Sequence, residues 1–208
     1  MRRSPSSLVL IVAACGSSAT PATPRACPTG AVTLAGQDDV AAVAGCASLA
    51  SVAIRTGEAL DLAPLERLES IAGDLAVGPS VGLGELALRG LREVGGTIKV
   101  AGNANLHGVF LPLLARAGSV DIGGNVALTT VSLPRLEATG ALVVVDNAGL
   151  ELLDVTKLGQ VDRELALVDN GMLVLVDSPA LQRAGSVRVE GNKILPDEQV
   201  QALRKLVP

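Results

Sequence analysis

The sequence predicts a mainly β fold, a single solenoid of about eight rungs of 22–23 residues that ends in a capping helix. Three observations predict it. An asparagine recurs at steps of 22, 22, 23 and 22 residues, an apolar residue stands three positions after each, and two apolar residues stand five and three positions before each. The recurring asparagines are Asn103, Asn125, Asn147, Asn170 and Asn192. A repeat this short cannot bury its own apolar face, so successive repeats must stack.

The apolar pair before each asparagine indicates a short strand, as in Ile98–Lys99–Val100. Apolar residues with period two place one face of a strand inward, and such strands stack in parallel at about 4.8 Å. Three earlier copies keep the apolar pair but carry Ser80, Gly57 and Gln37 at the asparagine position. The count of copies is therefore eight.

Each asparagine falls at the corner after its strand. A side-chain amide there can bond the turning backbone, and stacked amides can bond one another along the axis. We expect a structural ladder, with ligand contact as the alternative.

Both ends of a solenoid need covers. Residues 196–207 predict a short helix, with Pro and acidic residues first, basic residues last, and an apolar stripe of Val200, Leu203, Leu206 and Val207. At the other end, residues 38–48 predict a short helix or turn.

Two cysteines, Cys27 and Cys46, remain beyond the N-terminal segment. An even number in an exported protein favours a disulfide. Free thiols or a metal pair are the alternatives, and no further metal ligands lie near these cysteines in the sequence.

The N-terminus predicts export. Residues 1–14 combine two arginines with an apolar run too short to span a membrane, which is typical of a signal peptide. The ending Val12-Ala13-Ala14-Cys15 resembles a bacterial lipobox, which implies lipidation of Cys15; an ordinary secretory signal is the alternative. Residues 15–26 are then a lipidated tether and residues 27–208 the solenoid. Gly16 in place of aspartate implies the outer membrane or the cell surface.

Composition narrows the function. The net charge is −4, and removal of residues 1–14, with two arginines and no acids, makes it −6. An acidic chain with one Phe and no Trp or Tyr argues against nucleic-acid binding. A single histidine, His107, leaves little room for histidine-based catalysis, and we expect no cofactor and no metal.

The outward positions of the strands carry mostly small residues. Val143, Val145, Ala166 and Val168 form a predicted apolar patch, our candidate interaction surface. Two pairs of charged residues suggest alternative functional sites. Lys99 beside Asp121 suggests a catalytic pair or, more simply, a surface ion pair, and Asp146 with Asp169 suggests a calcium site for which only two carboxylates are present.

A family resemblance follows from three features: the cysteine pair, the Leu-rich arm over residues 60–71 with the Gly-x-Leu-x-Val strand at 73–77, and the Asn-x-x-Leu corners. Together they resemble the receptor L domain over residues 27–207. That resemblance implies a right-handed, leucine-rich-repeat-like β-helix of the kind found in receptor ectodomains and bacterial surface lipoproteins. Standard extracellular leucine-rich repeats are the competing interpretation, because they share the asparagine step but need a consensus that this chain lacks.

These observations predict a non-catalytic lipoprotein of the bacterial cell envelope. Its solenoid would bind a protein or a polysaccharide, and its lipid anchor would bind the membrane. A structural spacer without a ligand is the alternative, and a β-helix enzyme that degrades polysaccharides is a more distant one.

Overall fold

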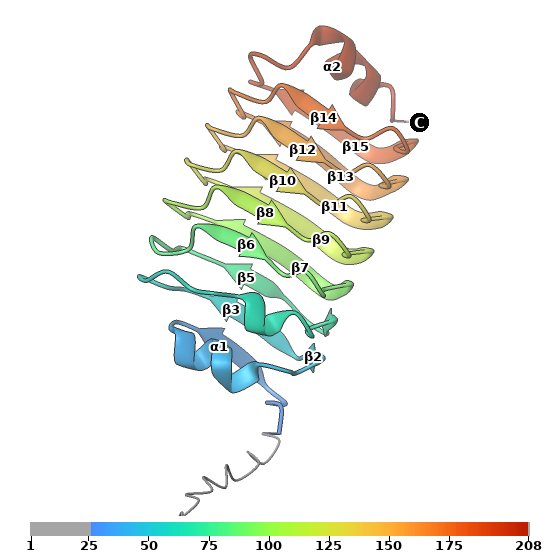
Figure 1. The fold of residues 1–208 in the computed structure, drawn as a ribbon. Coiled ribbons are helices and arrows are strands. Elements are labelled where there is room, and N and C mark those ends of the chain that lie inside the picture. Colours follow the sequence, from blue (N-terminus) through green and yellow to red (C-terminus); the bar gives the residue numbers. More distant parts are fainter. Residues whose placement is uncertain (1–25, 208) are drawn as a thin grey trace, which may run out of the picture.

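The computed structural model describes residues 26–207, which wind into a parallel β-solenoid (Figure 1). Eight strands of one sheet follow each other in parallel, one per rung, and confirm the predicted fold. These first-sheet strands are β1 (Ala31–Leu34), β3 (Ser51–Ile54), β5 (Leu75–Val77), β7 (Glu93–Ala101), β9 (Arg116–Gly123), β11 (Ala138–Val145), β13 (Gln160–Val168) and β15 (Arg183–Glu190). We number the rungs 1 to 8 by these strands.

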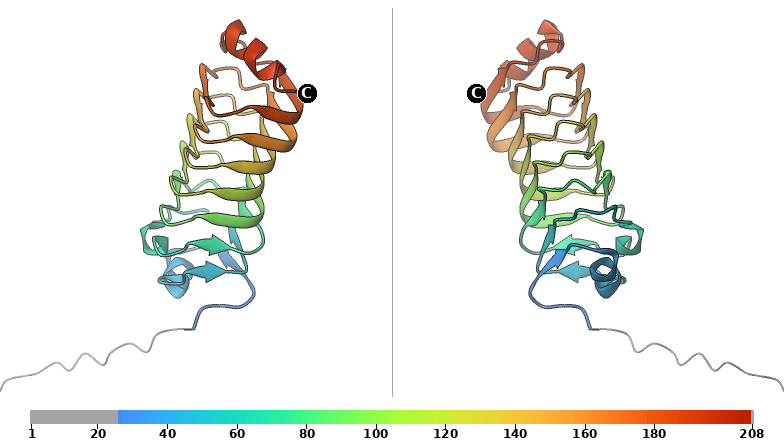
Figure 2. Two further views of the ribbon diagram at one scale, coloured as in Figure 1. Left: turned by 90° about the vertical axis from the view of Figure 1, so that its right-hand side faces the viewer. Right: turned by 90° about the vertical axis from the view of Figure 1, so that its left-hand side faces the viewer.

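The second side of each rung follows its first-sheet strand in the chain. Rungs 3 to 7 place a short strand there, and these five strands form a second parallel sheet. The two N-terminal rungs and the last rung place a helix there instead (Figure 2). In chain order the second-side elements are α1 (Gln37–Val43), η1 (Ala63–Leu65), β6 (Glu85–Ala87), β8 (Gly108–Phe110), β10 (Thr130–Ser132), β12 (Leu152–Asp154), β14 (Leu175–Asp177) and α2 (Asp197–Arg204). The two-residue strands β2 (Ser48–Leu49) and β4 (Ser70–Ile71) precede β3 and β5.

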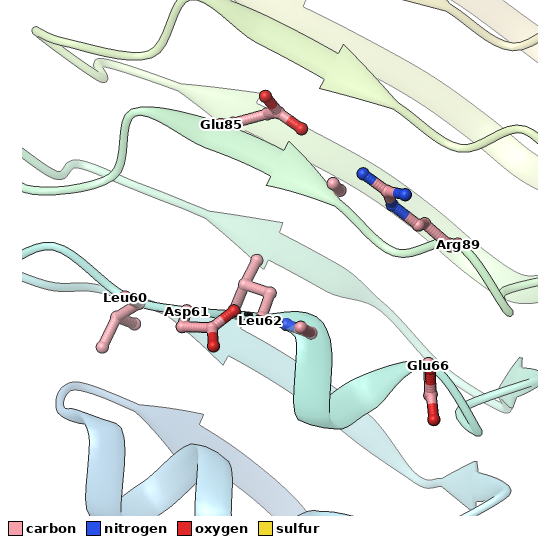
Figure 3. Close-up of a pocket in the computed structure, with 8 residues that line it drawn as sticks. Leu60, Asp61, Leu62, Glu66, Glu85 and Arg89 are labelled. Atoms are coloured by element: carbon pink, nitrogen blue, oxygen red, sulfur yellow. Dashed lines mark hydrogen bonds between the residues drawn. The ribbon is translucent and has the colours of Figure 1, made fainter.

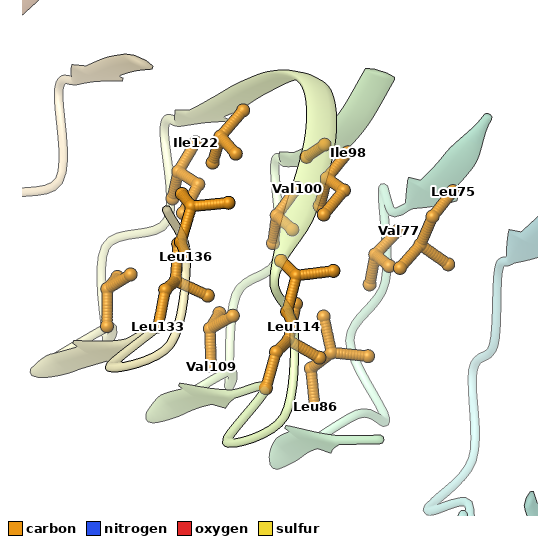
Figure 4. Close-up of a cluster of buried hydrophobic side chains, with 14 of the residues drawn as sticks. Leu75, Val77, Leu86, Ile98, Val100, Val109, Leu114, Ile122, Leu133 and Leu136 are labelled. Carbon is orange, nitrogen blue, oxygen red and sulfur yellow. The ribbon is translucent and has the colours of Figure 1, made fainter. Parts of the chain in front are cut away.

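The core is the column of aliphatic side chains between the two sides (Figure 4). Ile98 and Val100 of β7 face Val109 of β8 across it, and all three are at most 1% exposed. Equivalent residues of every middle rung repeat this contact one strand spacing away. Burial of a leucine or valine side chain contributes about 1.5–3 kcal/mol, so stacking supplies what a single rung lacks.

The long first-sheet strands bend at a glycine, where one rung passes close to the previous one. A Cβ at Gly118 would lie 2.7 Å from the carbonyl oxygen of Gly95, and one at Gly140 would contact that of Gly118. The 23-residue step has its extra residue in this bend of β13, where the register shifts between Val161 and Glu164. This column therefore excludes side chains because backbone already occupies the space.

The asparagines stand in file along one edge of the stack. The Asn125 Nδ2 donates to Asn147 Oδ1 at 3.0 Å and to the carbonyl of Val100, one rung below, at 2.9 Å. The Asn125 main-chain N–H donates to the same Oδ1 at 3.2 Å. Asn103 and Asn147 make the same three bonds. Asn170 makes the main-chain bond to Asn192 Oδ1 and the bond to the carbonyl of Val144. All four side chains from Asn103 to Asn170 are fully buried. The buried side-chain amides thus pair with main-chain N–H and C=O groups at the corners.

The residue before each asparagine adopts the left-handed conformation. It is Asp146 (φ 57°) or Asp169 (φ 55°) in two rungs and a glycine, such as Gly124 (φ 66°), in three others. Aspartate tolerates this backbone region better than most residues that carry a Cβ. The two stacked aspartates are therefore explained by the turn and need no bound cation.

The ends of the solenoid are closed by the helices. Val40 and Val43 of α1 are buried against the first rung, and a Cys27–Cys46 disulfide ties the chain before β1 to the residue after α1. At the other end Leu203 of α2 is buried, with Val200 and Leu206 packed beside it. Val207, which we predicted to belong to the same apolar stripe, is 42% exposed because it lies beyond the end of the helix.

Candidate binding site

The predicted apolar patch lies on the outer face of the first sheet, in the expected register. Val143 pairs with Ala166, and Val145 with Val168. The prediction that all four side chains are exposed is wrong for Ala166, which is 0% exposed, and the three valines are half-buried. Ala166 points outward, but its longer neighbours in register, Val143 and Arg188, flank its single methyl group. The patch is a smooth stretch of sheet with little accessible apolar surface.

The most exposed large apolar side chains lie elsewhere. Apart from Val207 they lie along the asparagine edge and at the start of the second side. They are Val81, Val126, Met172, Val174, Leu175 and Ile194, each 42–63% exposed. The alternation of apolar and other residues along the strands does not identify these side chains, because they belong to turns and to the ends of short strands. Sequence reasoning that followed only the strand pattern therefore missed them.

The charged pair predicted on the first sheet does not form an ion pair. Lys99 and Asp121 are neighbours in register, yet within residues 26–207 the one ion pair closer than 4.0 Å joins Arg188 Nε to Glu164 Oε1 at 3.7 Å. Both of those side chains are about half exposed, so their pairing is worth about 0–1 kcal/mol.

The second side holds a feature that the sequence did not predict, where the second sheet ends. In rung 2 the chain makes a turn in place of a strand: the N–H of Ala63 donates to Asp61 Oδ1 at 2.9 Å, and the N–H of Leu65 donates to the carbonyl of Leu62 at 2.9 Å. Pro64 in this turn has no N–H to offer. The N–H groups of Ala63 and Leu65 are thus used within the turn, and the segment does not pair with β6 of rung 3.

The result is a cavity of about 410 Å³ between rungs 2 and 3, open to the outside (Figure 3). We call it the rung 2–3 slot. It is lined by Leu60, Asp61, Leu62, Ala63 and Glu66 of rung 2 and by Glu85, Ala87 and Arg89 of rung 3. Its volume falls within the range of small-ligand sites.

The two ends of the slot are narrow. At one end Gly82 lies against the main chain of Glu58, and at the other Gly90 lies against the carbonyl of Glu66, so that a Cβ on either glycine would clash. Rungs 2 and 3 therefore keep their normal close stacking at both corners and part only between them. An occupant of the slot has to enter from the outer face.

A second hollow continues the slot along the outside of the second sheet. It shares Glu85, Ala87 and Arg89 with the slot and is bounded further on by Phe110 and Pro112. The Phe110 ring occupies the space that a side chain at Gly108 would need, which places the single aromatic ring of the chain over Gly108 beside this hollow. The slot and its extension thus combine a small apolar floor with charged side chains.

The remaining sequence predictions concern lipidation and metal binding. The predicted lipidation residue, Cys15, lies outside them. From Ala26 to Val207, no three His, Cys, Asp or Glu side chains are grouped so as to hold a metal ion. No helix in this range is long and apolar enough to cross a bilayer. No family model, curated protein or solved structure matches the chain.

Proposed function

We propose that this chain is a non-catalytic lipoprotein of the bacterial cell envelope whose solenoid binds a protein or polysaccharide partner. The signal-like residues 1–14, Cys15 and the short polar tether support anchoring and display. The receptor-L-like pattern of the repeats supports an extracellular binding role. The observation that carries the binding role is the rung 2–3 slot, an opening of about 410 Å³ at the point where the second sheet ends.

The anchor is tested by expressing the full chain in bacteria with a labelled fatty acid. We expect label on the protein and recovery in the membrane fraction, and we expect Cys15→Ser to lose both while the protein remains exported. Unlabelled wild-type protein in the soluble exported fraction would contradict the anchoring proposal.

The binding role is tested by placing a photo-cross-linking amino acid at Ala87, in the slot, or at the exposed Glu151, outside it, in cells that make the full chain. We expect a discrete adduct with a protein or a polysaccharide from position 87 and none from position 151. Absence of adducts from both positions, and from Val143 and Val168 as well, would favour the structural spacer.

A further inference from the structure

The strand at the upper wall of the slot has an open hydrogen-bonding edge. Successive residues of a strand direct their main-chain groups to opposite sides, and the N–H of Leu88 donates to the carbonyl of Phe110 in rung 4 at 3.3 Å. Leu88 therefore faces β8, and the residues at the odd positions of β6, Glu85 and Ala87, face rung 2. Throughout residues 26–207 no group bonds the N–H or C=O of these two residues on that side. Such an edge is a template for a peptide-like group.

The gap one rung lower shows how the protein fills such an edge. Between rungs 1 and 2 the Gln37 side chain lies beside the main chain of Asp61 (Gln37 Nε2 to Asp61 O 3.0 Å, Asp61 N to Gln37 Oε1 2.9 Å). One carboxamide thus satisfies both main-chain groups of one residue, as a neighbouring strand would. The rung 2–3 slot presents the same N–H and C=O arrangement at Glu85 and at Ala87 with no side chain of the described residues in that position.

The shape of the slot limits the size of the group that enters. Because rungs 2 and 3 meet at Gly82 and at Gly90, a continuous strand cannot lie in the plane of the sheet. A single side chain that enters from outside can reach β6. A carboxamide supplies the one acceptor and the one donor that the N–H and C=O of a single edge residue require.

Charge adds a second element of recognition. Asp61, Glu66 and Glu85 line the slot against a single cation, Arg89, and none of the four forms an ion pair within residues 26–207. A partner that carries a positive charge next to its carboxamide matches this excess of carboxylates, whereas an acidic partner is repelled.

We propose that the rung 2–3 slot binds a peptide segment of a partner protein through one asparagine or glutamine side chain, with a lysine or arginine beside it. The carboxamide pairs with Glu85 or Ala87 as Gln37 pairs with Asp61. This inference rests on the proposed binding function and names the partner class for it.

The test uses the full-length protein, labelled with ¹⁵N in detergent micelles, and a synthetic capped hexapeptide with Gln-Lys at its centre. Without peptide, the Glu85 and Ala87 amides should exchange with solvent much faster than those of Gly108 and Phe110, which face a neighbouring strand. With peptide, the Glu85 or Ala87 signal should shift saturably and its exchange should slow about tenfold. Peptides with Glu or Met in place of Gln should bind about tenfold more weakly, because they lack the donor.

A matched pair of variants locates the site. Ala87→Leu fills the floor of the slot and should weaken peptide binding about tenfold, whereas Ala104→Leu, at an exposed corner outside the slot, should leave it unchanged. Equal binding of the Gln and Met peptides, saturable shifts with N-acetylglucosamine in place of the peptide, or slow exchange of both amides in the free protein would each overturn the inference. A cross-linked polysaccharide at position 87 would also overturn it while leaving the proposed binding function intact.

Discussion

The middle rungs and the two N-terminal rungs solve the same packing problem in different ways. From rung 4 to rung 7 each rung repeats one solution, in which a strand, an asparagine and a second strand each pair with the equivalent group of a neighbouring rung. Rung 3 has the second strand but carries Ser80 in place of the asparagine. Rungs 1 and 2 lack the asparagine and the second strand, and use individual contacts instead: a disulfide, a helix and the Gln37–Asp61 pair. The repeated strands keep the second side closed from rung 3 to rung 7, whereas the individual contacts leave the rung 2–3 slot open.

The largest loss of stability is expected from a substitution in the middle of the asparagine ladder. Asn147→Ala removes the donors to the carbonyls of Ile122 and Val145 and the acceptor for Asn125, and the side chain that makes these bonds is fully buried. An unpaired buried polar group costs about 1–3 kcal/mol, so we expect unfolding free energy to fall by about 3 kcal/mol or more in urea titrations. Asn192→Ala is the control: its side chain is half-buried and ends the ladder, so the loss should be smaller. Equal losses at both positions would show that the amides do not act as a ladder.

Removal of the disulfide tests the N-terminal rungs. Replacing both Cys27 and Cys46 with alanine frees a loop whose ends are 19 residues apart, for which the chain-entropy model gives about 3 kcal/mol. Because contacts in a solenoid are between neighbours, we expect faster amide exchange in β1 and β3 and little change in β11. Uniform loss of protection along the stack would mean that the rungs unfold as one unit and that the two regions do not differ in stability.

The smallest expected effect is the pH dependence of stability contributed by Asp39. Asp39 Oδ2 accepts hydrogen bonds from the N–H groups of Ala35 and Gly36, at 2.9 and 3.0 Å, and these bonds lower its pKa below the ordinary value of 3.8. A lowered pKa in the folded state contributes stability above the unfolded-state value, and this contribution disappears as the pH falls through the folded-state pKa. We expect Asp39→Asn to lower stability slightly at pH 7 and the loss to shrink as the pH falls below 3.8. Denaturant titrations across this pH range check the expectation, and a loss that grows on acidification would contradict it.

The repeated part of this fold could be predicted from the sequence, because equivalent positions in successive repeats occupy the same environment and carry the same type of residue. All eight apolar pairs lie in the first-sheet strands, and both ends carry the expected helices. The sequence predicted the candidate site poorly. Ala166 was placed on the correct face, but strand alternation does not report the height of neighbouring side chains. The slot arises where Asp61 and Pro64 interrupt the repeat. A search for recurring residues does not identify a feature that occurs in a single rung.

The position of the disulfide has a mechanical consequence if the chain is anchored through Cys15. Tension applied at the N-terminus enters the domain at Cys27 and passes through the covalent cross-link directly to Cys46. Strand β1 and helix α1 lie inside that loop and are shielded from the pull. The first non-covalent contacts to carry the force are then those of β2 with β4 and of β3 with β5, so the capping helix can stay seated on the stack while the anchor is under strain.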